Sequence, residues 1–267
     1  MASLTSRLVE PVYRWISGRP SGRPGALEPD DAGGNADRAG GLVLIADGVG
    51  GMDLCGTGLR YVIGAERLPY AVEVFPWGHG LGRWYADLTD ADHRDQQARL
   101  LAEAVRRYRV DQPDPPVFLV AKSGGAGVVV KALELLDEAS VESVVLLSPA
   151  VSPGYDLVPA LRAVRRQLVV FWSPWDLVIL GVGTRFLGTV DRIKTVSAGL
   201  VGFRVPGPDD PDRDRTRQYG KLRQVRWRPE MAASLYFGGH LGTDCPLFLR
   251  KSVVPLLRGD GAETVRF

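Results

Sequence analysis

One serine, Ser123, lies where an apolar run turns directly into a helical pattern, in the stretch VFLVAKSGGAGVVVKALELL. The residues two positions before and after it, Ala121 and Gly125, are small, as a sharp strand-to-helix turn requires because it presses both against neighbouring backbone. Such a turn exposes the hydroxyl and directs the helix N-terminus and the Gly124 N–H at the reacting centre. The pattern predicts a nucleophilic serine, and the alternative is a plain turn with serine as the helix N-cap.

A serine nucleophile needs a base, and an acid that orients the base. Asp176 closes the second apolar run after the serine, and Asp156, after the intervening run, is the alternative acid. For the base, His240 stands between glycines far downstream, whereas His79 lies in an earlier loop that also follows an apolar run. The order serine, acid, histidine favours Ser123, Asp176 and His240 as the reacting set.

Two glycine-rich stretches also raise nucleotide-binding interpretations. The stretch AKSGGAG lacks the G-x-x-x-x-G-K-[ST] spacing of a phosphate-binding loop. The stretch IADGVGGMD does not meet the G-x-G-x-x-G pattern, and the next apolar run ends in FPW rather than in an acid that would bind a ribose. The sequence therefore disfavours both kinds of nucleotide site.

Apolar runs bounded by turn residues alternate with helical stretches from Leu42 onward. Continuous apolar runs are typical of strands buried on both faces. Their alternation with helices predicts an α/β fold with a mostly parallel sheet flanked by helices. The predicted strands lie in GLVLIADG, YAVEVFPWG, PPVFLVAKS, VESVVLLSPA and RQLVVFWSPWD, with LRQVRW as one more, and the clearest helix lies in DHRDQQARLLAEAVRRYRV.

The chain divides into an N-terminal arm or loop over residues 1–41 and one domain over residues 42–267. The arm is rich in Gly, Pro, Asp and Arg, and a short amphipathic helix is expected within residues 8–16. Further helices are expected over Leu157 to Val164 and in CPLFLRKSVVPLL, where Pro255 is expected to break the second one.

Composition bounds the class of protein. The chain has 267 residues, of which 45% are hydrophobic, and a net charge of +2. No Lys/Arg-rich run stands out, so nucleic acid is not an expected partner. Cys55 and Cys245 are too far apart in sequence to indicate a zinc site or a disulfide framework, and free thiols are expected. The N-terminus makes a poor signal peptide and no apolar stretch is long enough to span a bilayer, so a cytoplasmic protein is expected.

From Leu42 onward the chain resembles α/β-hydrolases of the serine esterase and lipase kind, and more narrowly a poorly characterised group of bacterial hypothetical hydrolases. The stretches that carry this resemblance are DGVGGMDLCGTGLRYV, PWGHGLGRWYADLTD, GTVDRIKTVSAGLVGFRVP and GGHLGTD. The order of serine, acid and histidine is specific for that superfamily, but it does not specify a substrate.

The resemblance implies an α/β-hydrolase fold that lacks the usual first hairpin, because nothing before Leu42 looks like one. It implies a serine hydrolase that cleaves a small-molecule or lipid carboxylic ester through an acyl-enzyme, with no cofactor and no metal. The N–H groups of Val49 and Gly124 would bind the oxyanion, although Asp47 stands where the family frequently has histidine. A thioesterase or acyltransferase with the same residues, or a non-catalytic binding protein on the same fold, is the alternative. The oligomeric state is not predicted.

The walls of the pocket are expected to come from two segments. The candidate substrate contacts on the loop after the second strand are Trp77, His79 and Trp84. The segment 177–205 is apolar and interrupted by glycines, so its side chains must be buried. We expect it to pack over or beside Ser123 as a wall of an acyl pocket, or under the sheet as ordinary core.

Two further ionisable residues near these motifs have other expected roles. Lys122 precedes the serine, but adjacent residues at such a turn point apart, so a structural or pocket-edge charge is expected rather than a catalytic base. His93 begins a charged helical stretch and is expected to be solvated.

Overall fold

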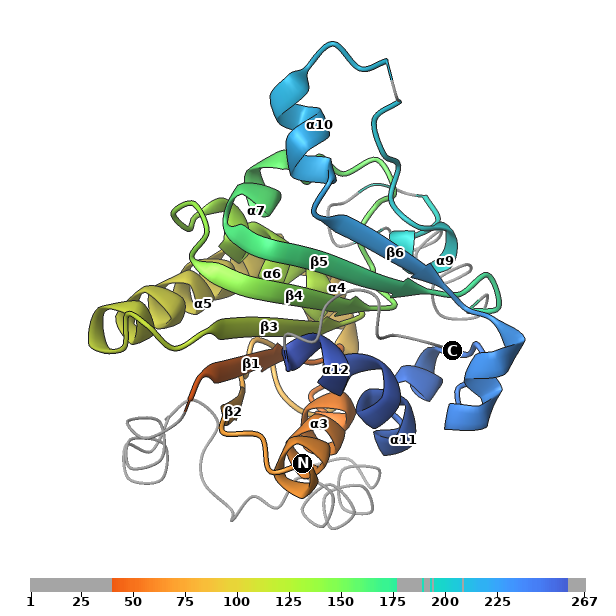
Figure 1. Ribbon diagram of the computed structural model, residues 1–267. Helices are drawn as coiled ribbons and strands as arrows, with labels where there is room; N and C mark the ends of the chain where they lie inside the picture. Colours follow the sequence, from red (N-terminus) through yellow and green to blue (C-terminus); the bar gives the residue numbers. More distant parts are fainter. Residues whose placement is uncertain (1–39, 177–188, 190–192, 194, 208, 259–267) are drawn as a thin grey trace.

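Six parallel strands form one sheet in the computed structural model, which describes residues 40–176, 189, 193, 195–207 and 209–258 (Figure 1). The strands run in the order β2-β1-β3-β4-β5-β6, and every pairing is parallel. Their bounds are β1 (Leu42–Ala46), β2 (Ala71–Val74), β3 (Val117–Lys122), β4 (Val141–Leu147), β5 (Val164–Trp172) and β6 (Leu222–Arg226). Each apolar run that the sequence marks as a strand forms one, so the predicted parallel sheet is confirmed.

The register brings the carboxyl ends of the central strands to one edge. Ala46 of β1 pairs with Ala121 of β3, and Ala121 pairs with Leu146 of β4. Leu146 in turn pairs with Val170 of β5. Because these residues lie level across the sheet, the loop after each strand leaves from the same edge, and Ser123 lies in the middle of it.

Helices cover both faces of the sheet (Figure 1). The helical segments are α3 (Leu54–Ala65), α4 (Trp84–Thr89), α5 (Ala91–Asp111), α6 (Gly125–Glu134), α7 (Val158–Arg162), α9 (Ala198–Val201), α10 (Arg213–Tyr219), η2 (Pro229–Ser234), η3 (His240–Asp244), α11 (Pro246–Phe248), η4 (Leu249–Val253) and α12 (Val254–Leu257). Helices α5, α6 and α7 pack side by side on one face, while α3 packs with η3, α11 and η4 on the other.

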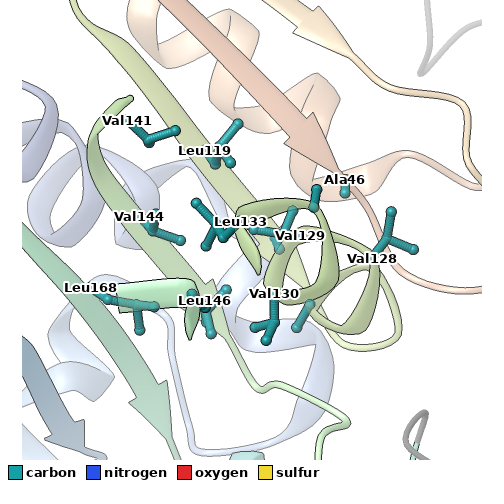
Figure 2. Close-up of a cluster of buried hydrophobic side chains, with 14 of the residues drawn as sticks. Ala46, Leu119, Val128, Val129, Val130, Leu133, Val141, Val144, Leu146 and Leu168 are labelled. Carbon is teal, nitrogen blue, oxygen red and sulfur yellow. The ribbon is translucent and has the colours of Figure 1, made fainter. Parts of the chain in front are cut away.

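Alternate residues of each central strand are buried on opposite faces, as the strand period of two requires. In β3, Leu119 belongs to the cluster under α5 and α6, whereas Val120 belongs to the cluster under α3 and η4. Figure 2 shows the first cluster, in which Val129 and Leu133 of α6 gather with Leu119 and with Val144 of β4. Burial on both faces explains why these strands read as uninterrupted apolar runs.

Two predicted helices differ from the observed ones. The helix expected over Leu157 to Val164 is limited to α7, because Val164 already pairs with Val141 as the first residue of β5. The closing helix is not broken at Pro255. It continues from α11 to α12 through η4, a π-helical turn, which relieves the clash that a proline ring makes with the preceding turn.

The segment predicted as a pocket wall is described only in its second half. In α9, the Ala198 N–H donates to Val151 O at 2.7 Å and the Gly199 N–H donates to Pro149 O at 2.8 Å. Leu200 joins the hydrophobic cluster on the α5 and α6 side. This half therefore lies at the carboxyl edge of the sheet, beside the loop that leaves β4, and its role as a pocket wall or as core stays a prediction. The residues chosen to decide the question, Leu180, Phe186 and Leu187, lie outside the described residues.

Several other expectations also fall mostly outside the described part of the chain. Apart from Gly40 and Gly41, the N-terminal arm, its short helix and any first hairpin would lie in residues 1–39, so these remain predictions. Within the described residues, no helix is long and apolar enough to cross a membrane.

Candidate active site

Ser123 makes the sharp turn between β3 and α6. Its φ of 49° lies in the left-handed region, which is uncommon for a residue with a side chain. The backbone fixes this turn, because the Ser123 N–H donates to Leu147 O and the Ala150 N–H donates to Ser123 O, each at 3.0 Å. A Cβ at Gly125 would lie 2.2 Å from Ala46 O, so the end of β1 excludes any larger residue there. The serine turn that the motif predicts is therefore present.

The loop after β1 packs directly against this turn. A Cβ at Gly124 would lie 2.6 Å from Val49 Cγ1, and a Cβ at Gly48 would lie 3.8 Å from Ser123 Cβ. Gly124 is also the N-cap of α6, so its N–H belongs to the first N–H groups of the helix, which the helix itself does not use. The two predicted oxyanion donors thus stand on adjoining segments beside the serine.

Hydrogen bonds occupy the backbone N–H groups on either side of Val49. The Gly48 N–H donates to Asp47 Oδ1 at 2.7 Å. The Gly50 N–H donates to Asp87 Oδ2, also at 2.7 Å. Between them, the Val49 N–H takes part in no hydrogen bond among the described residues, so this N–H is available to a ligand.

Trp77, a predicted substrate contact on the loop after β2, is buried beneath the loop after β1. Trp77 is only 2% exposed, and its Nε1–H donates to Asp47 O at 2.7 Å. A Cβ at Gly124 would lie 3.3 Å from its ring, so Trp77 underlies both the loop and the serine turn. Trp84 is half exposed and lies beside Gly50, so its role as a substrate contact stays a prediction.

Asp47 connects the loop after β1 to α3 by hydrogen bonds. Its carboxylate is buried and accepts the Gly48 N–H at 2.7 Å and the Gly56 N–H at 2.8 Å. Burial raises the pKa of Asp47 to about 6, and the nearby carboxylates of Asp244 and Asp53 add to this increase, while the two N–H donors oppose it. Asp47 therefore shapes the loop by binding backbone N–H groups.

Replacing Asp47 by asparagine should change how stability depends on pH. The folded-state pKa of about 6 lies above the ordinary 3.8, so the folded protein binds more protons between these values. The contribution of Asp47 to stability is therefore complete below the ordinary pKa of 3.8 and is lost as the pH rises through the folded-state pKa of about 6. The variant does not undergo this loss, so its free energy of unfolding relative to the parent should rise by about 3 kcal/mol between those two values. Urea denaturation over that range tests this, and a difference that is independent of pH contradicts it.

His240 and Asp176 meet at the same edge of the sheet. His240 Nδ1 lies 2.6 Å from Asp176 Oδ2, and their side chains are only 10% and 2% exposed. Their loops are in close contact, because a Cβ at Gly238 would lie 3.0 Å from Ser173 Oγ and 3.1 Å from Trp175 Cβ. The structure thus brings together the histidine and the acid that the chain order favours.

A hydrogen bond from Lys122, the neighbour of Ser123, links the serine turn to the segment of His240. Because Nδ1 of His240 bonds to Asp176, Nε2 is the nitrogen left to exchange a proton with a nucleophile. Lys122, next to Ser123, donates from Nζ to His240 O at 2.6 Å, so the two loops adjoin. No hydrogen bond among the described residues joins Ser123 Oγ to the imidazole, and such contacts commonly tighten only when a substrate binds.

His79, the alternative base, faces carboxylates with both ring nitrogens. Its Nδ1 lies 2.9 Å from Asp87 Oδ1, and its Nε2 lies 3.3 Å from Asp90 Oδ2. Its ring also stacks on His93, with the centroids 4.0 Å apart. His93 is itself bound, because its Nε2 lies 2.7 Å from Trp77 O, so the expectation of a merely solvated side chain is wrong. This arrangement points His79 at the acidic cluster, away from the role of a base for the serine.

Asp156, the alternative acid, lies apart from the imidazole. It is exposed, and its Oδ1 accepts the Val158 N–H at 3.2 Å at the start of α7. A carboxylate that accepts the N–H two residues further on forms a local Asx turn, which is a structural role. The geometry therefore favours Asp176 as the partner of His240.

Asp87 is a buried residue of the site that the sequence analysis does not identify. It has no exposed surface, and it accepts the Gly50 N–H and the His79 N–H, both at 2.7 Å. It thereby joins the loop after β1 to the loop after β2 and fixes the segment that carries Val49. In the sequence it stands in a charged stretch without periodicity, so no local signal marks it.

The described residues contain no group of three or more His, Cys, Asp and Glu side chains that could hold a metal ion. Cys55 and Cys245 are free thiols, as expected. Burial raises the pKa of the Cys55 thiol well above its ordinary value, and the carboxylates of Asp47 and Asp244 add to this effect.

The six strands are parallel and run in the order β2-β1-β3-β4-β5-β6. The positive-φ serine follows β3, and the acid and the histidine that pair follow β5 and β6, at the same edge of this sheet. The fold is that of an α/β-hydrolase. In open α/β sheets ligands bind at the carboxyl ends of the strands, so a binding site in this protein is expected at this edge.

No family model and no curated protein matches the sequence. Similar solved structures include a poly(3-hydroxybutyrate) depolymerase from Bordetella parapertussis, at 14% identity and a TM-score of 0.49 over 86% of this chain and 84% of that one. An esterase from Pyrococcus furiosus matches at 11% identity and a TM-score of 0.44, over 84% and 81% of the chains. A predicted hydrolase from Thermoplasma acidophilum matches at 15% identity and a TM-score of 0.43, over 82% and 86%. At these identities the likeness to these structures concerns the fold alone.

Proposed function

We propose that this protein is a serine hydrolase that cleaves carboxylic esters through an acyl-enzyme. One observation carries the proposal: the buried hydrogen bond between Asp176 and His240 lies at the same sheet edge as the strained turn of Ser123. A nucleophile at such a turn, beside a histidine that is oriented by an acid, is the arrangement of acyl-transfer catalysis.

In the proposed reaction, Ser123 Oγ attacks the ester carbonyl and passes its proton to His240 Nε2. Asp176 holds the imidazole through Nδ1 and stabilises the imidazolium. The N–H groups of Val49 and Gly124 bind the oxyanion that develops on the carbonyl oxygen. The imidazolium then protonates the departing alcohol, and a water molecule, deprotonated by the same histidine, releases the acid from the serine.

The substrate in this proposal is a small-molecule or lipid ester. The purified full-length chain should hydrolyse p-nitrophenyl acetate, butyrate or octanoate, and rapid acid quenching should trap a protein species whose mass is increased by one acyl group. Absence of both turnover and acyl adduct with all three esters would contradict the proposal. Faster turnover of a matched acyl thioester than of the oxygen ester would favour a thioesterase instead.

A further inference from the structure

Lys122 is a buried cation next to the proposed nucleophile. It is only 2% exposed, and as the last residue of β3 it follows Val120 on the face that α3 and η3 cover. A buried ammonium is costly unless each of its three N–H groups has an acceptor and its charge has a partner. The acceptors around Lys122 should therefore show what this charge does.

The ammonium of Lys122 binds three atoms of one short segment. Its Nζ lies 2.6 Å from His240 O, 2.6 Å from Thr243 Oγ1 and 2.8 Å from Asp244 Oδ1. All three acceptors belong to η3, whose first residue is His240. All three N–H groups of the ammonium are donated to this segment and Asp244 is its charge partner, so the side chain is directed at η3 and not at Ser123.

The η3 segment contributes no buried apolar side chain of its own, and its apolar contact comes from the buried ring of Tyr236, which lies against Gly242. The neighbouring side chains of Phe237 and Leu241 are 69% and 61% exposed, and Gly238 and Gly239 precede the histidine. Segments with few buried apolar contacts open most easily. Polar contacts must therefore supply much of the order here, and the Lys122 ammonium supplies three of them.

We propose that Lys122 is a positioning residue of the proposed serine hydrolase. It is bonded covalently to Ser123 on one side, and through its ammonium it holds the backbone of His240 on the other. One side chain thus sets the separation of nucleophile and base and keeps the imidazole in line with Asp176. The inference rests on the proposed function, because it assigns Lys122 a task in the same reaction.

The test compares two lysine variants of the full-length chain. Lys122→Met keeps the length of the side chain and removes the ammonium. Lys221→Met is the matched control, because Lys221 Nζ also binds backbone oxygens, Leu161 O at 3.0 Å and Val164 O at 2.7 Å, at the amino end of the sheet. Circular dichroism and cooperative urea unfolding show whether each variant folds.

For Lys122→Met we expect kcat for p-nitrophenyl butyrate to fall by about 10- to 100-fold, since misplacement of a reacting group by about 1 Å has an effect of this order. KM should stay nearly constant because the lysine does not touch the ester. Lys221→Met should keep the parent kcat. A folded Lys122→Met protein with the parent kcat would overturn the proposal, and so would an equal loss of kcat in both variants.

A spectroscopic readout separates positioning from general stabilisation. The proton that His240 Nδ1 shares with Asp176 should give a downfield ¹H resonance, which is identified by its loss in Asp176→Asn. Lys122→Met should broaden or remove this resonance, and Lys221→Met should leave it unchanged. Retention of the resonance in folded Lys122→Met would contradict the proposal.

Two further outcomes remain informative. If Ser123→Ala hydrolyses the ester as fast as the parent, the proposed hydrolase is wrong, and the resonance alone decides whether Lys122 positions His240. If Lys122→Met does not fold, Thr243→Val removes one of the three acceptors, together with the weak 3.4 Å hydrogen bond that Thr243 Oγ1 donates to His240 O, without changing the shape of the side chain. A smaller loss of kcat at constant KM would then support the proposal, and an unchanged kcat would contradict it.

Discussion

Replacement of Ser123 by alanine is expected to reduce the hydrolysis of p-nitrophenyl butyrate by roughly 10³- to 10⁶-fold. The hydroxyl is the proposed nucleophile, so without it no acyl-enzyme forms, and only the oxyanion donors and substrate binding remain. The fold should persist, because a hydroxyl is small and its loss leaves little cavity. Initial rates at saturating ester, together with circular dichroism, measure both effects.

Ser148→Ala is the matched control for this substitution. Ser148 directly follows β4 at the same sheet edge, is fully buried, and has a φ of 46°, so alanine meets the same backbone conformation there. It has no part in the proposed reaction, and the variant should keep kcat within about threefold of the parent. Substantial activity in Ser123→Ala, or an equal loss in both variants, would show that Ser123 is not the nucleophile.

Replacement of Asp176 by asparagine should lower kcat by roughly 10⁴-fold. Asp176 Oδ2 lies 2.6 Å from His240 Nδ1, and an amide there can present a hydrogen where the imidazole needs an acceptor. The histidine then adopts the wrong tautomer and Nε2 cannot take up the serine proton. The size of the side chain is almost unchanged, so no packing defect is expected. The kcat for ester hydrolysis by the folded variant therefore measures the loss of the carboxylate.

Asp156→Asn controls for the loss of a carboxylate near the same sheet. Asp156 is exposed and accepts the Val158 N–H, a bond that the asparagine oxygen can still accept. Activity should therefore stay at the parent level. If Asp156→Asn lost activity and Asp176→Asn kept it, the acid of the site would be Asp156, and the hydrogen bond between Asp176 and His240 would have no role in turnover.

The sheet could be predicted because its strands are encoded locally. Runs such as 117–120 and 144–147 are buried on both faces, so each is continuously apolar and ends in turn residues. The serine turn is also local, since Gly125 must be small where it meets the backbone of β1. The order of Ser123, Asp176 and His240 then follows from the order of the strands.

The residues that hold the loops of the site in place could not be predicted, because each of them contacts a partner that is remote in sequence. Lys122 and His240 are 118 positions apart, and Asp87 and Gly50 are 37 apart. Neither pair leaves a periodic pattern, since a buried ion or carboxylate is placed by tertiary packing alone. Trp77 illustrates the same limit: its position on the second loop is evident, but its burial beneath the first loop depends on contacts with that loop.

Labelling by a fluorophosphonate probe tests the central claim most directly, because such a probe reacts with a serine that a neighbouring base activates. The native full-length chain should gain the mass of one phosphonyl group, and peptide mapping should place that group on Ser123. The Ser123→Ala variant and the urea-unfolded parent should gain none. A native parent that remains unlabelled, or that carries the label on another residue, would contradict the assignment of Ser123 as the activated nucleophile of a serine hydrolase.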